Sequence, residues 1–382
     1  MVTINLKDFK SLISKLNMAV DKNSKLNPKS GWVELKTISS DCIKCSVSNY
    51  NYYFEAFIPI SVSAEEEIHA TVMADTFIPL VSKLDSDVFT MGEVRNCLIL
   101  STNTSEYTFP IIKEDGKVRC VDTIPFDYNG CMHTSLSGES LTSIADSNAN
   151  GLIDTTFSRD YQQYIYVDNL GAVTYTENIY VNDFENAKED EPFKFLLSCP
   201  QAKLLKVFGG EKSVEVFVDV PEDYSASKKV LFKTGSIQLV CVVQSDELTD
   251  KFPSLKIRNY AKNERETHAI LNKKELDKAI ARLMVFDKKY DATVLDYSQL
   301  EFKEDSVILN SVKSHNHETL YYTSSQNTKE HTSRIRFADL QNQLKAITTS
   351  TVDISYGESG AIVLNTSGLK QLIPEVTVRG EE

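Results

Sequence analysis

The feature that most constrains this chain is an internal repeat of about 66 residues. Six segments place apolar residues at i, i+3, i+4 and i+7, or part of that pattern, which is the spacing of an amphipathic helix. The clear copies begin at Phe9, Phe77 and Leu276, and the weaker ones at Leu141, Leu204 and Leu340. Successive anchors lie 68, 64, 63, 72 and 64 residues apart. This near-constant spacing predicts six copies of one structural unit.

Between the expected helices, the hydrophobic period changes from that of a helix to that of a strand. Val214, Val216 and Val218 alternate along one such run, and Ile237 and Leu239 belong to another. Alternating runs separated by Gly, Asn and Asp are typical of antiparallel strands joined by hairpins. Each unit is therefore expected to be one helix followed by three or four strands, which makes the chain an α+β protein.

A unit of this length is marginal as an independent domain, so we expect the units to pair. The pairing predicts three similar domains, at residues 1–127, 128–256 and 257–382. The joints fall at 123–130 and 245–264, where Pro125 and Pro253 lie among polar or charged residues. Each joint precedes a helix that starts a new pair.

The charge distribution suggests one basic surface on an acidic body. The chain carries a net charge of −13, whereas nucleic-acid-binding proteins usually show a basic footprint. The six expected helices, however, together carry +4. Their polar faces carry the cations that we predict to contact DNA: Lys7, Lys10, Lys15, Lys203, Lys206, Lys274, Lys278, Arg282 and Lys345. Such faces suit phosphate contacts, although exposed lysines are also ordinary solubilising surface, and the third helix carries Glu139 and Asp146 instead.

Motifs for bond chemistry are absent from the sequence. It contains no phosphate-binding loop, nucleophile elbow, zinc-protease motif or EF-hand loop. Cys42 and Cys45 form a lone C-x-x-C in a segment that alternates like a strand, and His315 and His317 lie in a polar stretch, so we expect no metal there. We expect no cofactor and no enzymatic activity.

The remaining composition points to a soluble cytoplasmic protein. The seven cysteines show no disulfide framework, which fits a reducing compartment. No apolar run approaches the ~20 residues needed to cross a membrane, and the N-terminal residues lack a signal-peptide pattern.

Over nearly its whole length, the chain resembles the bacterial DNA polymerase III beta subunit, the sliding clamp family. The segments that carry the resemblance are 48–58, 71–77, 232–235, 252–253 and 372–376. In that family each domain is a duplicated helix-plus-sheet unit, and two chains close head to tail into a ring with twelve helices facing the DNA. The resemblance implies the clamp fold, a head-to-tail homodimer ring, sequence-independent contact with double-stranded DNA, and a DNA polymerase and a clamp loader as partners. The distance from the family and a composition rich in Lys, Asn, Ser and Tyr suit a phage-encoded clamp.

The resemblance also implies an apolar cleft in which short peptide motifs of partner proteins dock. Carried over position by position, its residues are Thr176, Ile179, Val181, Pro253, Ile257, Leu372, Ile373, Pro374 and Val376. The alternative is that these residues are ordinary core. Two departures touch the cleft: 177–180 replaces the family's usual Asp-Gly-His-Arg turn, and the tail continues through 377–382. The preferred peptide therefore stays open.

These observations favour a DNA sliding clamp, a processivity factor that tethers a polymerase to DNA so that rebinding becomes intramolecular. The alternative is a clamp-fold accessory protein that tethers a transcription or repair factor without forming a replication ring. An unrecognised enzyme is the third hypothesis, which a deep pocket with convergent carboxylates or a bound metal would favour.

Overall fold

The computed structural model describes residues 1–21, 27–60, 67–152, 159–176, 178–184, 193–262, 265, 267–287, 297–358, 360–366 and 368–376. The chain divides into two compact units. Unit 1 comprises 1–142 and 204–244, and unit 2 comprises 143–203 and 245–382. None of the described helices is long and apolar enough to cross a membrane.

The helices confirm the six-fold repeat. The α-helices are α1 (Leu6–Ala19), α2 (Ala74–Lys83), α3 (Gly138–Ser143), α4 (Cys199–Leu204), α5 (Asp246–Thr249), α6 (Ser254–Lys262), α7 (Lys273–Asp287) and α8 (Phe337–Lys345). All six anchor residues of the repeat are between 0% and 3% exposed. The weaker patterns correspond to irregular helices, because α3 continues as a π-helix (Ile144–Asn148) and α4 as a 3₁₀ turn (Leu205–Phe208).

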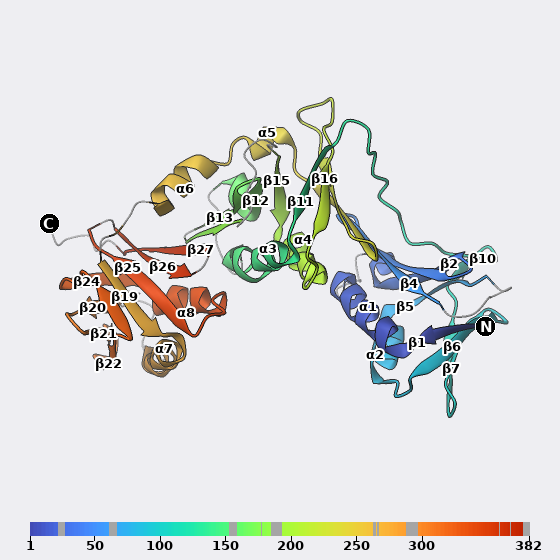
Figure 1. The fold of residues 1–382 in the computed structure, drawn as a ribbon, viewed down its shortest axis with the longest axis horizontal. Helices are drawn as coiled ribbons and strands as arrows, with labels where there is room; N and C mark the ends of the chain where they lie inside the picture. The colour runs from blue at the N-terminus through green and yellow to red at the C-terminus, as the bar shows by residue number, and fades with distance from the viewer. Residues whose placement is uncertain are drawn as a thin grey trace. The chain divides into compact units, whose positions relative to one another are not determined.

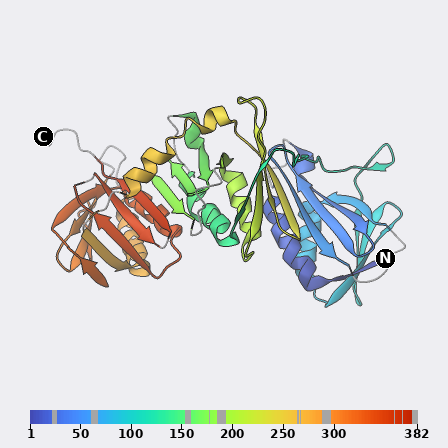
Figure 2. The same cartoon turned by 45° about the horizontal axis from the view of Figure 1, so that its top comes forward.

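Unit 1 is built on an eight-stranded antiparallel sheet, with α1 packed against α2, β3 and β4 (Figure 1). The sheet order is β11 (Met132–Leu136), β16 (Val214–Val218), β17 (Lys228–Lys233), β18 (Ile237–Val243), β4 (Tyr52–Pro59), β3 (Cys42–Ser48), β2 (Trp32–Ser39) and β5 (His69–Met73). Figure 2 shows the blue strands β2–β4 and the yellow-green strands β17 and β18 running side by side in this sheet.

Two smaller sheets complete unit 1. The four-stranded sheet has the order β1 (Val2–Asn5), β6 (Val88–Val94), β7 (Cys97–Ser101) and β8 (Glu106–Pro110), and the two-stranded sheet pairs β9 (Lys113–Glu114) with β10 (Lys117–Val118). The first helix begins after Asn5, whose side chain accepts a hydrogen bond from the Asp8 amide at 3.2 Å. Its apolar face contributes Phe9, whose ring meets Phe77 edge-on at 6.2 Å and Phe89 at 5.1 Å.

Unit 2 repeats this plan around a nine-stranded sheet. Its order is β15 (Lys194–Ser198), β12 (Tyr164–Asp168), β13 (Gly171–Tyr175), β14 (Ile179–Asp183), β27 (Leu369–Pro374), β26 (Ala361–Thr366), β25 (Thr351–Tyr356), β19 (Thr267–Asn272) and β23 (Ser324–Gln326). A four-stranded sheet has the order β22 (His317–Tyr321), β21 (Ser306–Ser311), β20 (Ser298–Phe302) and β24 (His331–Ile335). The helices α7 and α8 pack together in this unit (Figure 1).

Both large sheets continue across the expected domain boundaries. In unit 1, β18 pairs with β4, which places Leu239 opposite Phe54. In unit 2, β14 pairs with β27, which places Ile179 opposite Leu372. Backbone hydrogen bonds therefore link residues on either side of 127/128 and of 256/257, while the three-domain division stays a prediction from the repeat.

Candidate peptide cleft and nucleic-acid interface

An apolar cluster lies on one face of the nine-stranded sheet, under α6. We call it the α6 cluster. Its buried members are Tyr161, Tyr166, Val173, Val181, Leu196, Phe252, Ile257, Ala261, Val363 and Leu372. Four half-buried side chains pack against it: Tyr164, Tyr175, Ile179 and Leu248. A surface whose apolar side chains are partly covered offers anchoring positions for a peptide.

The sheet register explains why these residues share one face. Tyr175 lies opposite Ile179, Ile179 opposite Leu372, and Leu372 opposite Val363. Directly opposite residues of paired strands project from the same face. The helix α6 covers this face with Ile257 and Ala261, which are four positions apart and lie on one side of the helix.

A buried arginine fastens α6 to the sheet. Arg258 donates from Nη2 to the Asp168 Oδ1 and from Nη1 to the Asp183 Oδ1, both at 2.9 Å, and its side chain is 4% exposed. The same Asp168 oxygen accepts the Leu170 and Gly171 amides at 2.9 and 3.0 Å. Burial raises the pKa of Asp168, and the nearby Arg258 charge and these hydrogen bonds oppose that shift. The carboxylate is thus well supplied with donors.

Aromatic packing at the start of α6 fixes the second joint. Phe252 stacks on Tyr166 with ring centroids 5.0 Å apart and meets Tyr161 edge-on at 5.6 Å. The Pro253 carbonyl accepts the Ile257 amide at 3.1 Å, which helps to close the first turn of α6. Sequence reasoning identified neither α6 nor these rings as parts of the cleft, although the Ile257–Ala261 spacing was a weak signal for the helix.

The structure brings part of the predicted cleft together. Val181, Ile257 and Leu372 are buried members of the α6 cluster, and Ile179 lies half-buried against it. Pro253 follows the cluster residue Phe252 and is half-buried.

The other predicted cleft residues lie outside this cluster. Thr176 is buried, and its hydroxyl hydrogen-bonds to the Asn178 carbonyl at 3.2 Å. Pro374 is exposed, and Val376 is half-buried with its amide bonded to the Arg334 carbonyl at 2.7 Å. Strand alternation places Ile373 on the opposite side of β27, where it is 0% exposed in the core with Leu340 and Leu344. Position 177 and the tail 377–382 lie outside the described residues.

The predicted DNA-contacting cations differ in how freely they can reach a ligand. Lys7, Lys203, Lys206, Lys274, Lys278, Arg282 and Lys345 are exposed. Lys10 and Lys15 are half-buried: the Lys10 ammonium donates to the Leu84 carbonyl, and Lys15 lies 3.6 Å from Glu211.

Several of the exposed cations have local partners, Lys203 and Lys206 among them. Arg282 forms a bidentate pair with Glu318, which raises the pKa of Arg282 and lowers that of Glu318. Lys345 donates to the Asn342 side chain at 2.9 Å. The strongest candidates for phosphate contact are therefore Lys7 on α1, and Lys274 and Lys278 on α7.

The two cysteines of the C-x-x-C pair lie on one strand. Cys45 is buried and Cys42 is half-buried, three positions apart on β3, so alternation directs them to opposite faces. A different group, Glu34, His69 and Cys120, has ligand atoms within 4.8 Å of one another. Its carboxylate is already used, because Glu34 bonds to the His69 ring at 2.9 Å and accepts the Val121 amide at 2.9 Å.

Comparison with known proteins gives a likeness in structure without one in sequence. No family model matches the chain, and no curated protein matches it. The DNA polymerase III beta subunit of Thermotoga maritima matches with a TM-score of 0.75 at 15% identity, covering 99% of each chain. The beta subunit of Streptococcus pyogenes matches with a TM-score of 0.74 at 19% identity, covering 99% of this chain and 100% of that one.

A third solved structure contains a bound peptide. The Helicobacter pylori beta clamp bound to a DNA ligase peptide matches with a TM-score of 0.69 at 12% identity, covering 98% of this chain and 99% of that one. These matches extend over both units of the chain. The protein therefore has the fold of the DNA polymerase III beta-subunit sliding clamps.

Proposed function

We propose that this chain is a DNA sliding clamp that encircles duplex DNA and tethers a polymerase and other factors without bond chemistry of its own. The observation that carries the proposal is the likeness to beta-subunit clamps over 99% of the chain. The sixfold repeat supports it, since two chains would supply the twelve helices that the resemblance implies.

The proposed ring is a head-to-tail homodimer. Such a contact needs two different surfaces on one chain. Each four-stranded sheet has two edge strands, β1 and β8 in unit 1 and β22 and β24 in unit 2. An edge strand presents backbone donors and acceptors that a strand of another chain can pair with. We propose that β8 of one chain and β22 of the next form this contact.

The proposed DNA contact uses the exposed lysines of α1 and α7. Contacts between lysine and phosphate depend on charge and read no base, so they permit sliding. Lys7, Lys274 and Lys278 are the residues that carry this part of the proposal. We further propose the α6 cluster as the cleft for partner peptides, by analogy with the peptide-bound Helicobacter pylori clamp.

The decisive experiment measures mass and topology. Light scattering should give the mass of two 43.0 kDa chains. Protein loaded on nicked circular DNA should remain bound and should be lost when one restriction cut opens the circle. A monomer that is retained on neither form overturns the ring. That result would favour the clamp-fold accessory protein instead.

A matched set of variants tests the DNA contact. Replacing Lys7, Lys274 and Lys278 together by Gln should weaken duplex binding and flatten its dependence on salt, because each phosphate contact adds about 0.9 to the slope of log K against log salt. The control replaces three exposed lysines outside the helices, Lys36, Lys117 and Lys212, by Gln. Equal losses in both triple variants would show that only net charge matters.

A further inference from the structure

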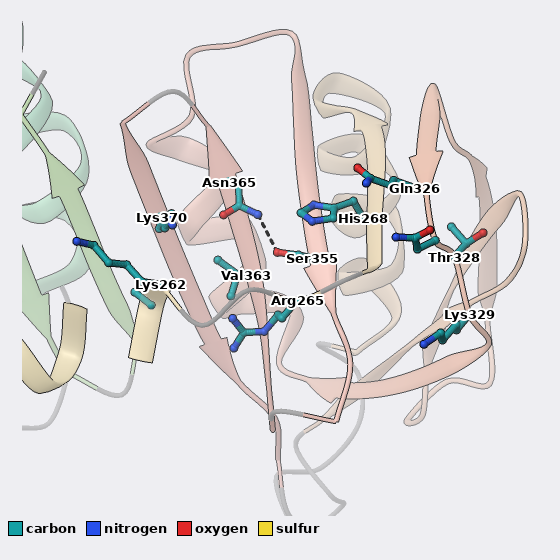
Figure 3. Close-up of a pocket in the computed structure, with 12 residues that line it drawn as sticks. Lys262, Arg265, His268, Gln326, Thr328, Lys329, Ser355, Val363, Asn365 and Lys370 are labelled. Carbon is teal, nitrogen blue, oxygen red and sulfur yellow. Dashed lines mark hydrogen bonds between the residues drawn. The ribbon is translucent and has the colours of Figure 1, made fainter. Parts of the chain in front are cut away.

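A polar pocket of about 810 Å³ lies on the same sheet as the α6 cluster, entirely within unit 2. It is lined from the end of α6, from β19, β25, β26 and β27, and from the segment after β23. Figure 3 shows Lys262 and Lys370 on the β27 side of this pocket and Lys329 on the opposite side. Ala261 and Val363 belong both to the pocket lining and to the α6 cluster.

The sheet register connects the two surfaces directly. Val363 lies opposite Ser355, Ser355 opposite His268, and His268 opposite Gln326. The row that begins with Ile179 and Leu372 in the apolar cluster thus continues through polar residues into the pocket. Neighbouring strands lie about 4.8 Å apart, so Leu372 and His268, three strands apart, are separated by about 14 Å. An extended peptide covers that distance with about four residues.

The lining of the pocket is cationic. Among the described residues it carries Lys262, Arg265, Lys329, Lys370 and His268, and no Asp or Glu. Because the chain as a whole carries −13, this concentration of positive charge stands out from the rest of the surface.

Two of these groups are held in place by other parts of unit 2. Arg265 is largely buried and donates from Nε to the Ala361 carbonyl at 3.3 Å. The His268 ring bonds to the Asp353 carboxylate at 3.0 Å. The Asn365 amide donates to the Ser355 hydroxyl at 2.7 Å (Figure 3). Lys262 is exposed and Lys370 is half-buried, so both ammonium groups can reach a ligand.

We propose that this pocket binds acidic residues of a partner peptide whose apolar anchor docks on the α6 cluster. The inference rests on the proposed function and adds to it the chemistry of the flanking sequence. Carboxylates within about four residues of the apolar anchor would reach Lys370, Lys262 and then Arg265. The shared face and the shared residues Ala261 and Val363 make one continuous binding surface.

The test uses four synthetic fluorescent peptides with one apolar core, Leu-Ala-Leu-Leu. Two carry four Glu residues, before or after the core, and two carry four Gln residues at the same places. Fluorescence anisotropy gives their affinities for the full chain. For one of the two orientations, Glu should bind about tenfold more tightly than Gln, since several weak ion pairs add together. The gain should shrink as salt rises.

Variants test whether the higher affinity of the Glu peptides over the Gln peptides arises in the pocket. The double change Lys262→Gln and Lys370→Gln should reduce the gain to about twofold or less, by removing two of those pairs. The matched control, Lys117→Gln and Lys212→Gln, alters two exposed lysines of unit 1 and should preserve it. The anchor variant Ile179→Ser should weaken Glu and Gln peptides equally. Thermal melts of the lysine variants should match that of the parent, because Lys117, Lys212 and Lys262 are exposed and Lys370 is only half-buried.

Several outcomes overturn the inference. If Glu and Gln peptides bind equally in both orientations, the pocket does not read charge, while the clamp proposal stands on its retention test. If no peptide binds, the inference fails, and circular DNA retention alone decides the proposed function. If the double lysine variant loses affinity for a duplex oligonucleotide but not for the Glu peptide, the pocket is a nucleic-acid site.

Discussion

One face of each large sheet is covered by a joint of the chain, and the two joints differ in shape. In unit 1, the segment 119–128 lies on the eight-stranded sheet as an irregular strap. In unit 2, the corresponding joint forms α5 and α6 on the nine-stranded sheet. Both joints follow the last strand of one expected domain and cover apolar residues, and each of the two apolar clusters has half-buried side chains packed against it.

The strap fills its face with its own side chains. Val121 is buried in a cluster with Tyr53, Leu231 and Val240, and half-buried Phe126 packs beside them. Several polar contacts hold the backbone of the strap; among them, the Val121 amide donates to Glu34 at 2.9 Å, and Lys229 donates to the Pro125 carbonyl at 2.8 Å.

The helix covers its face along a single line. A helix is about 10 Å across with its side chains, so residues on the sheet beside it stay partly accessible. Tyr175 and Ile179 are such residues. The comparison shows that a helix in one unit and an irregular strap in the other can cover apolar faces of the two large sheets, each leaving half-buried apolar side chains beside it.

The largest expected effect comes from cutting the attachment of α6. Arg258→Ala should destabilise the chain by about 3–5 kcal/mol, because it leaves the Asp168 carboxylate buried without its cation. Urea unfolding measures the loss. The matched control, Arg282→Ala, breaks an exposed pair with Glu318 and should cost far less. Similar losses in the two variants would mean that α6 is not held by its buried arginine.

A smaller effect is expected when the strap is weakened. Val121→Ala removes two buried methyl groups and should destabilise unit 1 by about 2 kcal/mol. Asp127→Ala, at an exposed position on the same strap, should change stability little. Peptide affinity, read by anisotropy, should be unchanged in both variants. A loss of peptide binding in Val121→Ala would contradict the assignment of the peptide site to the α6 cluster alone.

The pH dependence of the unfolding free energy should report on the Asp168 carboxylate of unit 2. Burial raises the pKa of Asp168 above its ordinary 3.8 in the folded chain. Between pH 3.8 and the raised pKa, Asp168 holds a proton in the folded chain that it lacks in the unfolded chain. The stabilisation that this proton provides is fully present below pH 3.8 and is lost as pH rises through the folded pKa. Asp168→Asn cannot titrate. As pH falls from 6 towards 3.5, the unfolding free energy of the parent should therefore rise relative to that of the variant. The opposite trend would contradict the raised pKa of Asp168.

The smallest expected difference concerns two cysteines. Burial raises the pKa of both Cys45 on β3 and Cys241 on β18, and both are 0% exposed. Since β4 pairs with both strands, the two thiols should become reactive at the same urea concentration. Alkylation followed by mass spectrometry reads each site, with exposed Cys120 as the reference for unhindered labelling. Two separate midpoints would show that the expected domains 1–127 and 128–256 open independently.

The sequence by itself determined the repeat and the class of fold. Helical spacing at Phe9, Phe77 and Leu276 predicts buried anchors, because each apolar face must be covered by its own unit's sheet. The alternation in 214–218 and 237–243 likewise predicts β16 and β18. These are local patterns of period 3.6 and 2, and they survive in a single sequence without any knowledge of partners.

The tertiary structure decided the site. Which face of β27 carries Leu372 and which carries Ile373 depends on pairing with β14, a strand almost 200 residues earlier. The pairing of Arg258 with Asp168 and Asp183, and the row from Ile179 to His268, join positions that no local period relates. Such contacts depend on register between distant strands, and register is a property of the assembled sheet rather than of any segment in it.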